Sequence, residues 1–216
     1  MFYNISKRVL DIFSALVLAV LFLPIWVIIP ILQKLGSKGP IFYKPERVGK
    51  NGKKFAMYKF RSMKMFEVDG KEVHATEFWN HNPELFEKYK KNGWKLELDE
   101  DPRITPLGKI LRQTSIDEMP QVINVLKGEM SLVGPRAYVD PELKDAIKRY
   151  GNKIEGLIEQ SLSAKPGITG PWQVSGRNDI PWNQRVAIDA DYAQRKSIIY
   201  DLYIIFKTPF AMISKW

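Results

Sequence analysis

The 216-residue sequence contains no cysteine, which excludes disulfides, thiolate metal sites and a cysteine nucleophile. It has two histidines, His74 and His81, and their spacing is not that of zinc ligands. Catalytic zinc and serine–histidine catalysis are therefore not indicated. Walker A loops and glycine-rich dinucleotide-binding motifs are also missing, so kinase and Rossmann classes have no support.

Acidic residues are in the minority. The chain has 33 Lys and Arg against 24 Asp and Glu, a formal net charge of +9. Such a balance predicts an anionic partner, which is nucleic acid, a phospholipid surface or a phosphorylated substrate. No nucleic-acid-binding module is recognisable, so we do not expect a nucleic-acid partner. The length and the 45% hydrophobic content suffice for one good core.

Charge is absent from residues 12–33, a run long enough for a membrane-spanning helix. Pro24 lies in the middle of this run, so a straight helix is not expected. Both flanks are basic, with Lys7 before the run and Lys38 after it, which places both ends in the cytoplasm. These features favour a re-entrant helix broken at Pro24. The alternative is a tilted, kinked transmembrane helix.

A β-hairpin is predicted after this run. The strand-like segments Ile41–Tyr43 and Phe55–Phe60 flank an Asn-Gly pair at 51–52, which is a strong hairpin signal. Alternation along the second strand places Lys59 and Arg61 on one face. Two such cations either bind phosphates or form a solvated strand edge.

Most of the remaining chain has helical patterns, so the predicted fold class is α+β and mostly helical. Thr105 followed by proline is a helix start, and Lys127-Gly128 is a helix end. The acidic run at 99–101 is treated as a turn rather than a metal site. The helical segments expected are one or two within 64–100, 105–113, a helix up to 126, one or two within 140–163, and 198–216.

Two adjacent carboxylates, Asp117 and Glu118, stand out in this basic chain. Ser115 and Glu118 have the spacing of a capping box, and Asp117 is itself an alternative N-cap. Local sequence alone favours capping. The chemical alternative is a carboxylate that attacks or binds a phosphorylated substrate.

Two arginines follow predicted turns that contain glycine or proline, a setting that suits phosphate binding. Arg136 comes after Gly-Pro at the end of a hydrophobic run, and Arg177 follows Gly176 at the end of a glycine- and proline-rich loop. A guanidinium presented in this way offers forked hydrogen bonds to phosphate oxygens. An exposed turn arginine is the alternative in each case.

Taken in order, six motifs resemble the bacterial sugar transferase family, the monotopic polyprenyl-phosphate phosphoglycosyl transferases. They cover essentially the whole chain. The motifs are Tyr58–Met63, Asp101–Thr105, Arg112 with Thr114–Glu118, Ser131–Arg136, Lys165–Gly170 and Trp172–Asn178.

The resemblance implies transfer of a sugar 1-phosphate from a UDP-sugar to undecaprenyl phosphate, with release of UMP. The reaction would occur at the cytoplasmic face of the bacterial inner membrane, as the first membrane step of O-antigen, capsule or exopolysaccharide synthesis. Galactose is the first expectation for the sugar and glucose the second. The oligomeric state stays open, with a homodimer suggested by larger members of the family.

The resemblance also implies roles for particular residues. Asp117 would be the nucleophile and a ligand of Mg²⁺, with Glu118 as its partner. Phosphate-binding roles would fall on Arg112, Arg136 and Arg177, while Lys59 and Arg61 stay substrate-binding candidates from their shared face of the predicted strand. Residues 1–38 would form the re-entrant membrane helix with its basic flanks, and residues 39–216 a cytoplasmic catalytic domain with amphipathic interfacial helices.

Two positions depart from the family pattern. Ala137 replaces the proline that usually follows Gly-Pro-Arg, and Leu23 replaces the serine before the helix-breaking proline. Larger relatives carry an N-terminal membrane bundle and a regulatory domain, so we expect either a short enzyme or a catalytic fragment. The competing function is a non-enzymatic, membrane-anchored basic protein that binds anionic lipid.

Overall fold

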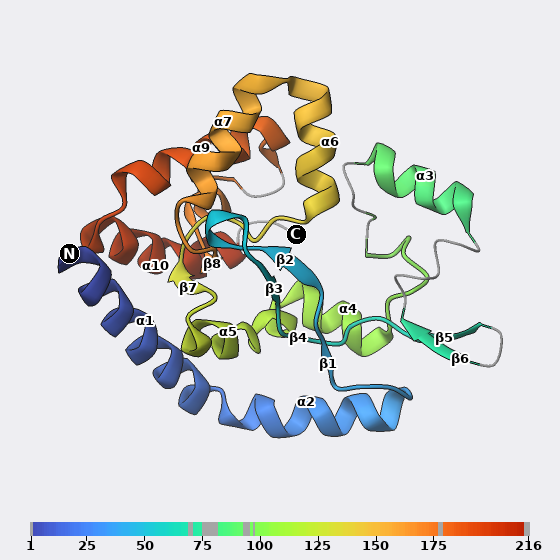
Figure 1. Ribbon diagram of the computed structural model, residues 1–216. Coiled ribbons are helices and arrows are strands. Elements are labelled where there is room, and N and C mark those ends of the chain that lie inside the picture. The colour runs from blue at the N-terminus through green and yellow to red at the C-terminus, as the bar shows by residue number, and fades with distance from the viewer. Residues whose placement is uncertain are drawn as a thin grey trace. The chain divides into compact units, whose positions relative to one another are not determined.

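The computed structural model describes residues 2–68, 71–74, 82–92, 96, 98–176 and 179–213. Helices dominate and all sheets are two-stranded within these residues, which confirms the α+β, mostly helical class (Figure 1). The helices are α1 Phe2–Leu21, α2 Leu23–Gly36, α3 Pro83–Lys91, α4 Pro106–Gln113, α5 Gln121–Lys127, α6 Asp140–Tyr150, α7 Asn152–Leu162, α8 Pro171–Ser175, α9 Trp182–Arg195 and α10 Ile198–Ile213, with short 3-10 turns η1 Lys50–Gly52 and η3 Ile116–Glu118.

The strands in the described part of the chain are short and pair as four ladders. Antiparallel pairs join β1 Phe42–Tyr43 to β4 Lys59–Phe60, β2 Glu46–Val48 to β3 Lys54–Ala56, and β5 Met65–Val68 to β6 Lys71–His74. The parallel pair joins β7 Ser131–Val133 to β8 Gly167–Thr169.

The chain divides into two compact units. Unit 1 contains residues 1–21, 44–58 and 120–216, and unit 2 contains residues 22–43 and 59–119. In unit 1, α6, α7 and α9 enclose a core that includes Tyr138, Ile154 and Val186. In unit 2, the side chain of Phe60 packs with Ile29 and Leu111, and it stacks on Phe42 with ring centroids 5.7 Å apart.

The N-terminal segment is broken, as predicted, but the break lies at Phe22 rather than at Pro24. Pro24 occupies the first turn of α2, where a missing backbone N–H has no helical partner to lose. Within the described residues, no single helix is long and apolar enough to cross a membrane. The bent pair α1 and α2 meets the length and composition requirement only when taken together.

The predicted hairpin around Asn51 forms, with differences in detail. Asn51 has a φ of 56°, and the connection from β2 to β3, residues 49–53, contains the 3-10 turn η1 rather than being a two-residue loop. The strand β2 was not foreseen, and β5 and β6 occupy part of the 64–100 stretch where only helices were expected. One helix, α3, was correctly expected there.

Helix ends with clear local signals lie where they were predicted. The Thr105 hydroxyl accepts a hydrogen bond from the Gly108 N–H at 2.8 Å, and Gly128 ends α5 in the left-handed conformation. Gly151 separates α6 from α7. The helix α9 and the parallel pair β7–β8 were not predicted.

Candidate active site

The adjacent carboxylates lie on η3 in unit 2. Ser115 has a left-handed φ of 56° and its side chain makes no capping hydrogen bond. The next helix, α5, begins only at Gln121, with Pro120 at its N-cap position. The capping interpretation is therefore wrong for both Ser115 and Asp117. Asp117 does not serve as the N-cap of α5.

Lys59 contacts both carboxylates. Its Nζ lies 2.5 Å from Oε1 of Glu118 and 3.7 Å from Oδ2 of Asp117. The strand β4 fixes this lysine, because the neighbouring Phe60 is buried in the core of unit 2 and Lys59 itself pairs with Tyr43. The structure thus brings together three of the residues selected from the sequence.

The Asp117 carboxyl group is almost fully buried, with 7% of the residue exposed. Burial raises its pKa to about 6, and the negative charge of Glu118 acts in the same direction, whereas Lys59 and Arg112 lower it. Ionised Asp117 therefore predominates at neutral pH while remaining poorly hydrated. A carboxylate in this state is a better nucleophile than one in bulk water.

Arg112 stands at the end of α4, and its charge favours the ionised form of Asp117. Its Nε donates a hydrogen bond to the Ser62 hydroxyl at 2.9 Å. Burial lowers the pKa of the Arg112 guanidinium, while the charge of Asp117 opposes that shift. Arg112 thus supplies positive charge close to the carboxylate pair.

The Arg61 side chain has different partners from the Lys59 side chain. Its guanidinium donates hydrogen bonds to the Pro40 carbonyl at 2.7 Å and to the Ser37 hydroxyl at 2.9 Å. The residue is 3% exposed. The structure places Arg61 where it holds the chain that follows α2, and its predicted role in substrate binding stays a prediction.

The acidic run at 99–101 is accounted for by ion pairs. Asp99 pairs with Lys109, Glu100 pairs with Lys88 at 2.9 Å, and Asp101 forms a buried pair with Arg103 at 2.6 Å. Each acid thus has a cationic partner. This agrees with the interpretation of the run as a structural turn.

Magnesium is the metal that the resemblance implies. Among the described residues, no three His, Asp or Glu side chains gather into a metal site. The two carboxylates of η3 nevertheless suit Mg²⁺, which is usually held by one or two carboxylates together with substrate phosphates and water. The donor set fits a metal that arrives with a phosphorylated substrate.

Arg136 lies in unit 1, in the segment that follows β7. The backbone is tightly packed there: Gly134 N–H donates to the Thr169 carbonyl at 3.0 Å, and a Cβ on Gly134 would lie 2.2 Å from the Lys165 carbonyl oxygen. The Arg136 guanidinium lies over the Trp172 ring, 5.4 Å from its centroid. Arg177 is outside the described residues.

Two further residues near Arg136 were missed by the sequence reasoning. Arg185 lies over the same Trp172 ring at 5.3 Å, and Asp189 is fully buried beneath the Arg136 backbone. Both come from α9. The signal for Asp189 was an acid at helical spacing with the apolar Val186, Ala190 and Ala193, which are also buried.

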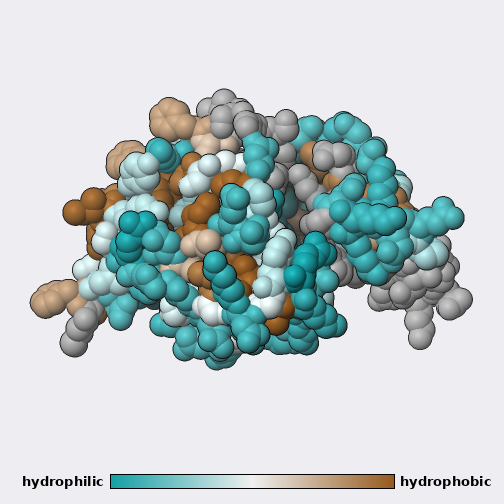
Figure 2. All heavy atoms as spheres, turned by 90° about the horizontal axis from the view of Figure 1, so that it is seen from above, coloured by the Kyte–Doolittle hydropathy of each residue, from teal (hydrophilic) through white to brown (hydrophobic). Residues whose placement is uncertain are grey.

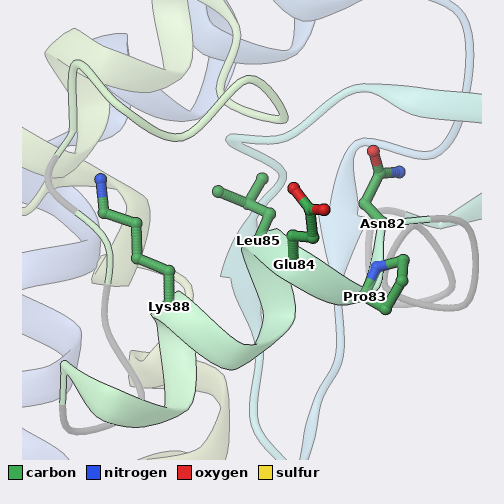
Figure 3. A pocket seen from close by; sticks show the side chains of 5 residues that line it. All are labelled: Asn82, Pro83, Glu84, Leu85 and Lys88. Carbon is green, nitrogen blue, oxygen red and sulfur yellow. The ribbon is translucent and has the colours of Figure 1, made fainter.

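A separate pocket of about 610 Å³ opens at α3 (Figure 3). Its lining side chains come from the start of α3 and its first turns, and Figure 3 shows Glu84 and Leu85 side by side there. None of the residues selected from the sequence lines this pocket.

A sequence model described as Bacterial sugar transferase matches residues 2–215. The chain belongs to the bacterial sugar transferase family. The resemblance seen in the six motifs is thus confirmed, and so is the prediction that the protein is an enzyme. The match extends over both units.

Three relatives within the bacterial sugar transferase family show how far the similarity extends. The exopolysaccharide production protein ExoY of Rhizobium meliloti is 40% identical over 205 residues, covering 95% of this chain and 84% of the relative. An undecaprenyl-phosphate galactose phosphotransferase of Salmonella typhimurium is 40% identical, covering 94% of this chain and 39% of the relative. A UDP-glucose:undecaprenyl-phosphate glucose-1-phosphate transferase of Escherichia coli is 36% identical, covering 96% and 40%.

Proposed function

We propose that the protein transfers a sugar 1-phosphate from a UDP-sugar to undecaprenyl phosphate and releases UMP, in the synthesis of a bacterial polysaccharide. Family membership supports the reaction class, because relatives are named for this transfer to undecaprenyl phosphate. The single observation that carries the proposal is the buried Asp117 carboxylate, which caps no helix and lies beside Lys59 and Glu118.

The transfer would take place in two steps. An oxygen of the Asp117 carboxylate attacks the phosphorus that bears the sugar, the bond from that phosphorus to the bridging oxygen breaks, and UMP leaves. The product is an aspartyl phosphosugar. A phosphate oxygen of undecaprenyl phosphate then attacks the same phosphorus and frees the carboxylate. Covalent catalysis of this kind divides one difficult displacement into two easier ones.

The residues around Asp117 have distinct roles in this scheme. Lys59 lowers the pKa of Asp117 and so keeps the nucleophile ionised, and Arg112 acts in the same direction. Asp117 and Glu118 together would hold Mg²⁺, which neutralises the charge of the diphosphate when bound. Arg61, Arg136 and Arg177 are the remaining candidates for contacts with the substrate phosphates.

The membrane is the proposed location, with the reaction at the cytoplasmic face of the inner membrane. Residues 1–38 would enter and leave the same leaflet, and residues 39–216 would form the catalytic domain.

Large apolar side chains are exposed along α1 and α2, including Phe13, Val20 and Leu23. On α10, Phe206 and Phe210 are each 73% exposed. Figure 2 shows brown hydrophobic residues exposed among teal hydrophilic ones. Exposed apolar surface of this extent suits a lipid interface.

Galactose is our first choice for the sugar and glucose the second, since both occur in the names of relatives. A homodimer remains a proposal.

The competing function, a non-enzymatic anchor protein that binds anionic lipid, explains the net charge and the apolar segment. It does not explain a buried Asp117 carboxylate that lies beside Lys59 and Glu118, or the family match.

The covalent step is tested by incubating the detergent-solubilised protein with a UDP-sugar and Mg²⁺ but no lipid acceptor. We expect a burst of UMP and a protein mass increased by one sugar phosphate, with the adduct on Asp117 after peptide mapping. Asp117→Asn keeps the side-chain volume and should lower turnover about a thousandfold or more.

Three outcomes would contradict parts of this proposal. An active Asp117→Asn variant would exclude Asp117 as the nucleophile. An adduct on Glu118 would assign that role to the neighbouring carboxylate. Transfer to lipid without any adduct or burst would favour a single displacement in a ternary complex. Asp99→Asn is the matched control, because Asp99 is an exposed acid of unit 2 paired with Lys109, and we expect normal turnover.

A further inference from the structure

A buried carboxylate of α9 holds the backbone that carries Arg136. Oδ2 of Asp189 accepts hydrogen bonds from the Arg136 N–H at 2.9 Å and from the Tyr138 hydroxyl at 2.7 Å. The residue has 0% exposure. Its second oxygen, Oδ1, is also buried and accepts no hydrogen bond from the described residues.

This arrangement is unfavourable for stability alone. Burial raises the pKa of Asp189 to about 7, although the hydrogen bonds from Arg136 and Tyr138 lower it. An acid with one unsatisfied buried oxygen stabilises a fold less than an apolar side chain of similar size would. What Asp189 does provide is a fixed geometry for its two hydrogen-bond donors.

Asp189 completes a set of backbone restraints on three successive residues. The Gly134 N–H donates to the Thr169 carbonyl at 3.0 Å, and the Pro135 carbonyl accepts from the Gly167 N–H at 2.9 Å. The Arg136 N–H, the next backbone donor along the chain, is the one that Asp189 binds. The direction in which the Arg136 side chain leaves the backbone is thereby fixed, and its guanidinium lies over Trp172.

We propose that Asp189 is a positioning residue that fixes Arg136 for binding the diphosphate of the nucleotide sugar. This proposal rests on the proposed function, in which Arg136 contacts the substrate phosphates. Tyr138 acts with Asp189 by occupying the same oxygen. Asp189 itself touches no substrate, because it is buried below the backbone of Arg136.

The test is equilibrium binding of UDP to the full detergent-solubilised chain, measured by calorimetry without turnover. The variants are Arg136→Ala, Asp189→Asn, Asp189→Ala and the double variant Arg136→Ala/Asp189→Asn. Asn keeps the shape and one acceptor oxygen of Asp189 but removes the charge. The Asp189→Asn variant therefore still gives a result if Asp189→Ala fails to fold. Asp191→Asn is the matched control, since Asp191 lies on the same helix and pairs with Arg195 near the surface.

We expect Arg136→Ala to weaken UDP binding by about tenfold or more, because a charge-assisted contact is lost. Asp189→Asn should weaken it severalfold and Asp189→Ala further. In the double variant, Asp189→Asn should add almost nothing to the loss from Arg136→Ala, because the two changes act through one guanidinium. Asp191→Asn should bind UDP like the unchanged protein.

Two results would overturn the positioning role alone. One is a loss at Arg136→Ala with normal UDP binding in the folded Asp189 variants. The other is a double variant whose losses multiply, which would mean that Asp189 acts on the fold in general. Normal binding by Arg136→Ala would overturn both this proposal and the assignment of Arg136 to the substrate phosphates.

Discussion

The surroundings of Asp117 control the ionisation of its carboxyl group. Burial raises the pKa of its carboxyl group to about 6, and Lys59 works against that shift. The carboxyl group is therefore ionised at pH 7 but becomes protonated as the pH falls below about 6. A protonated carboxyl group cannot attack phosphorus, so the pKa of Asp117 sets the acid limit of the proposed reaction.

The initial rate of UMP release should therefore fall as the pH is lowered through about 6. Lys59→Met removes the charge that lowers the pKa of Asp117, so the midpoint of this fall should move to higher pH by about one unit. The measurement is the rate of UMP release at low UDP-sugar concentration across the pH range, with the same buffer ions throughout.

Lys88→Met provides the comparison, because Lys88 is a lysine of unit 2 that pairs with Glu100 on the surface. Its midpoint should match that of the unchanged protein. An unchanged midpoint in Lys59→Met would show that Lys59 does not control the ionisation of Asp117, even if the rate itself decreased.

Helices whose ends are marked by nearby residues were predictable from the sequence. Strands that form only by pairing with a distant segment were not. The helix from Pro106 and the C-cap at Gly128 follow from side chains and backbone preferences within a few residues of each other. The strands β7 and β8 are three residues each, and they pair across a long stretch of chain. Periodicity in so short a run carries no information about its partner.

The candidate site divides in the same way. In unit 2, Asp117, Glu118, Lys59 and Arg112 were selected from the sequence, whereas the geometry of the turn at Ser115 was not. Arg136 of unit 1 was also selected from the sequence. A left-handed serine is rare and has no strong sequence signature. Asp189 was missed because its partners are the backbone of Arg136 and the hydroxyl of Tyr138, both distant in sequence.

The close packing of the backbone directly after β7 can be tested at Gly134. A Cβ at this position would lie 2.2 Å from a backbone oxygen, and a backbone atom has little freedom to move. We expect Gly134→Ala to lower the free energy of unfolding by about 2–3 kcal/mol, with a loss of activity as the Arg136 segment shifts. Denaturant unfolding in detergent measures the first effect and UMP release the second.

Gly156→Ala is the matched control within unit 1. Gly156 lies inside α7, and a Cβ there would meet nothing within 4 Å. Alanine favours a helix over glycine by about 0.8–1 kcal/mol, so this variant should be slightly more stable. A Gly134→Ala protein as stable as Gly156→Ala would show that the close packing of β7 and β8 is not required.

In unit 1 as a whole, the charged side chains Lys7 and Asp11 of α1 contact other protein groups. Lys7 Nζ lies 3.3 Å from Asp11 and 3.2 Å from Asp201 of α10, while Asp11 accepts a hydrogen bond from the Leu132 N–H at 2.9 Å. All three charged residues are buried. Lys7 and Asp11, which precede the uncharged run at 12–33, are thus held by protein contacts, while the apolar Phe2, Ile5 and Val9 of the same helix are exposed.

The arrangement of α1 and α2 leads to a prediction about topology. A re-entrant segment leaves both of its ends in the cytoplasm, whereas a spanning segment separates them. Because the chain has no native cysteine, single cysteines report position without background. Lys7 is unsuitable for this purpose because it is buried in an ion cluster, but Asn4 on α1 and Lys38 after α2 are both exposed.

We expect neither Asn4→Cys nor Lys38→Cys to react with a membrane-impermeant thiol reagent in intact spheroplasts, and both to react after lysis. The basic residues on both flanks are the physical reason, since positive charge is retained on the cytoplasmic side. Labelling after lysis controls for access to each thiol, and UMP release confirms that each variant folds. If one position reacts in intact spheroplasts and the other does not, the segment spans the membrane and the re-entrant arrangement is wrong.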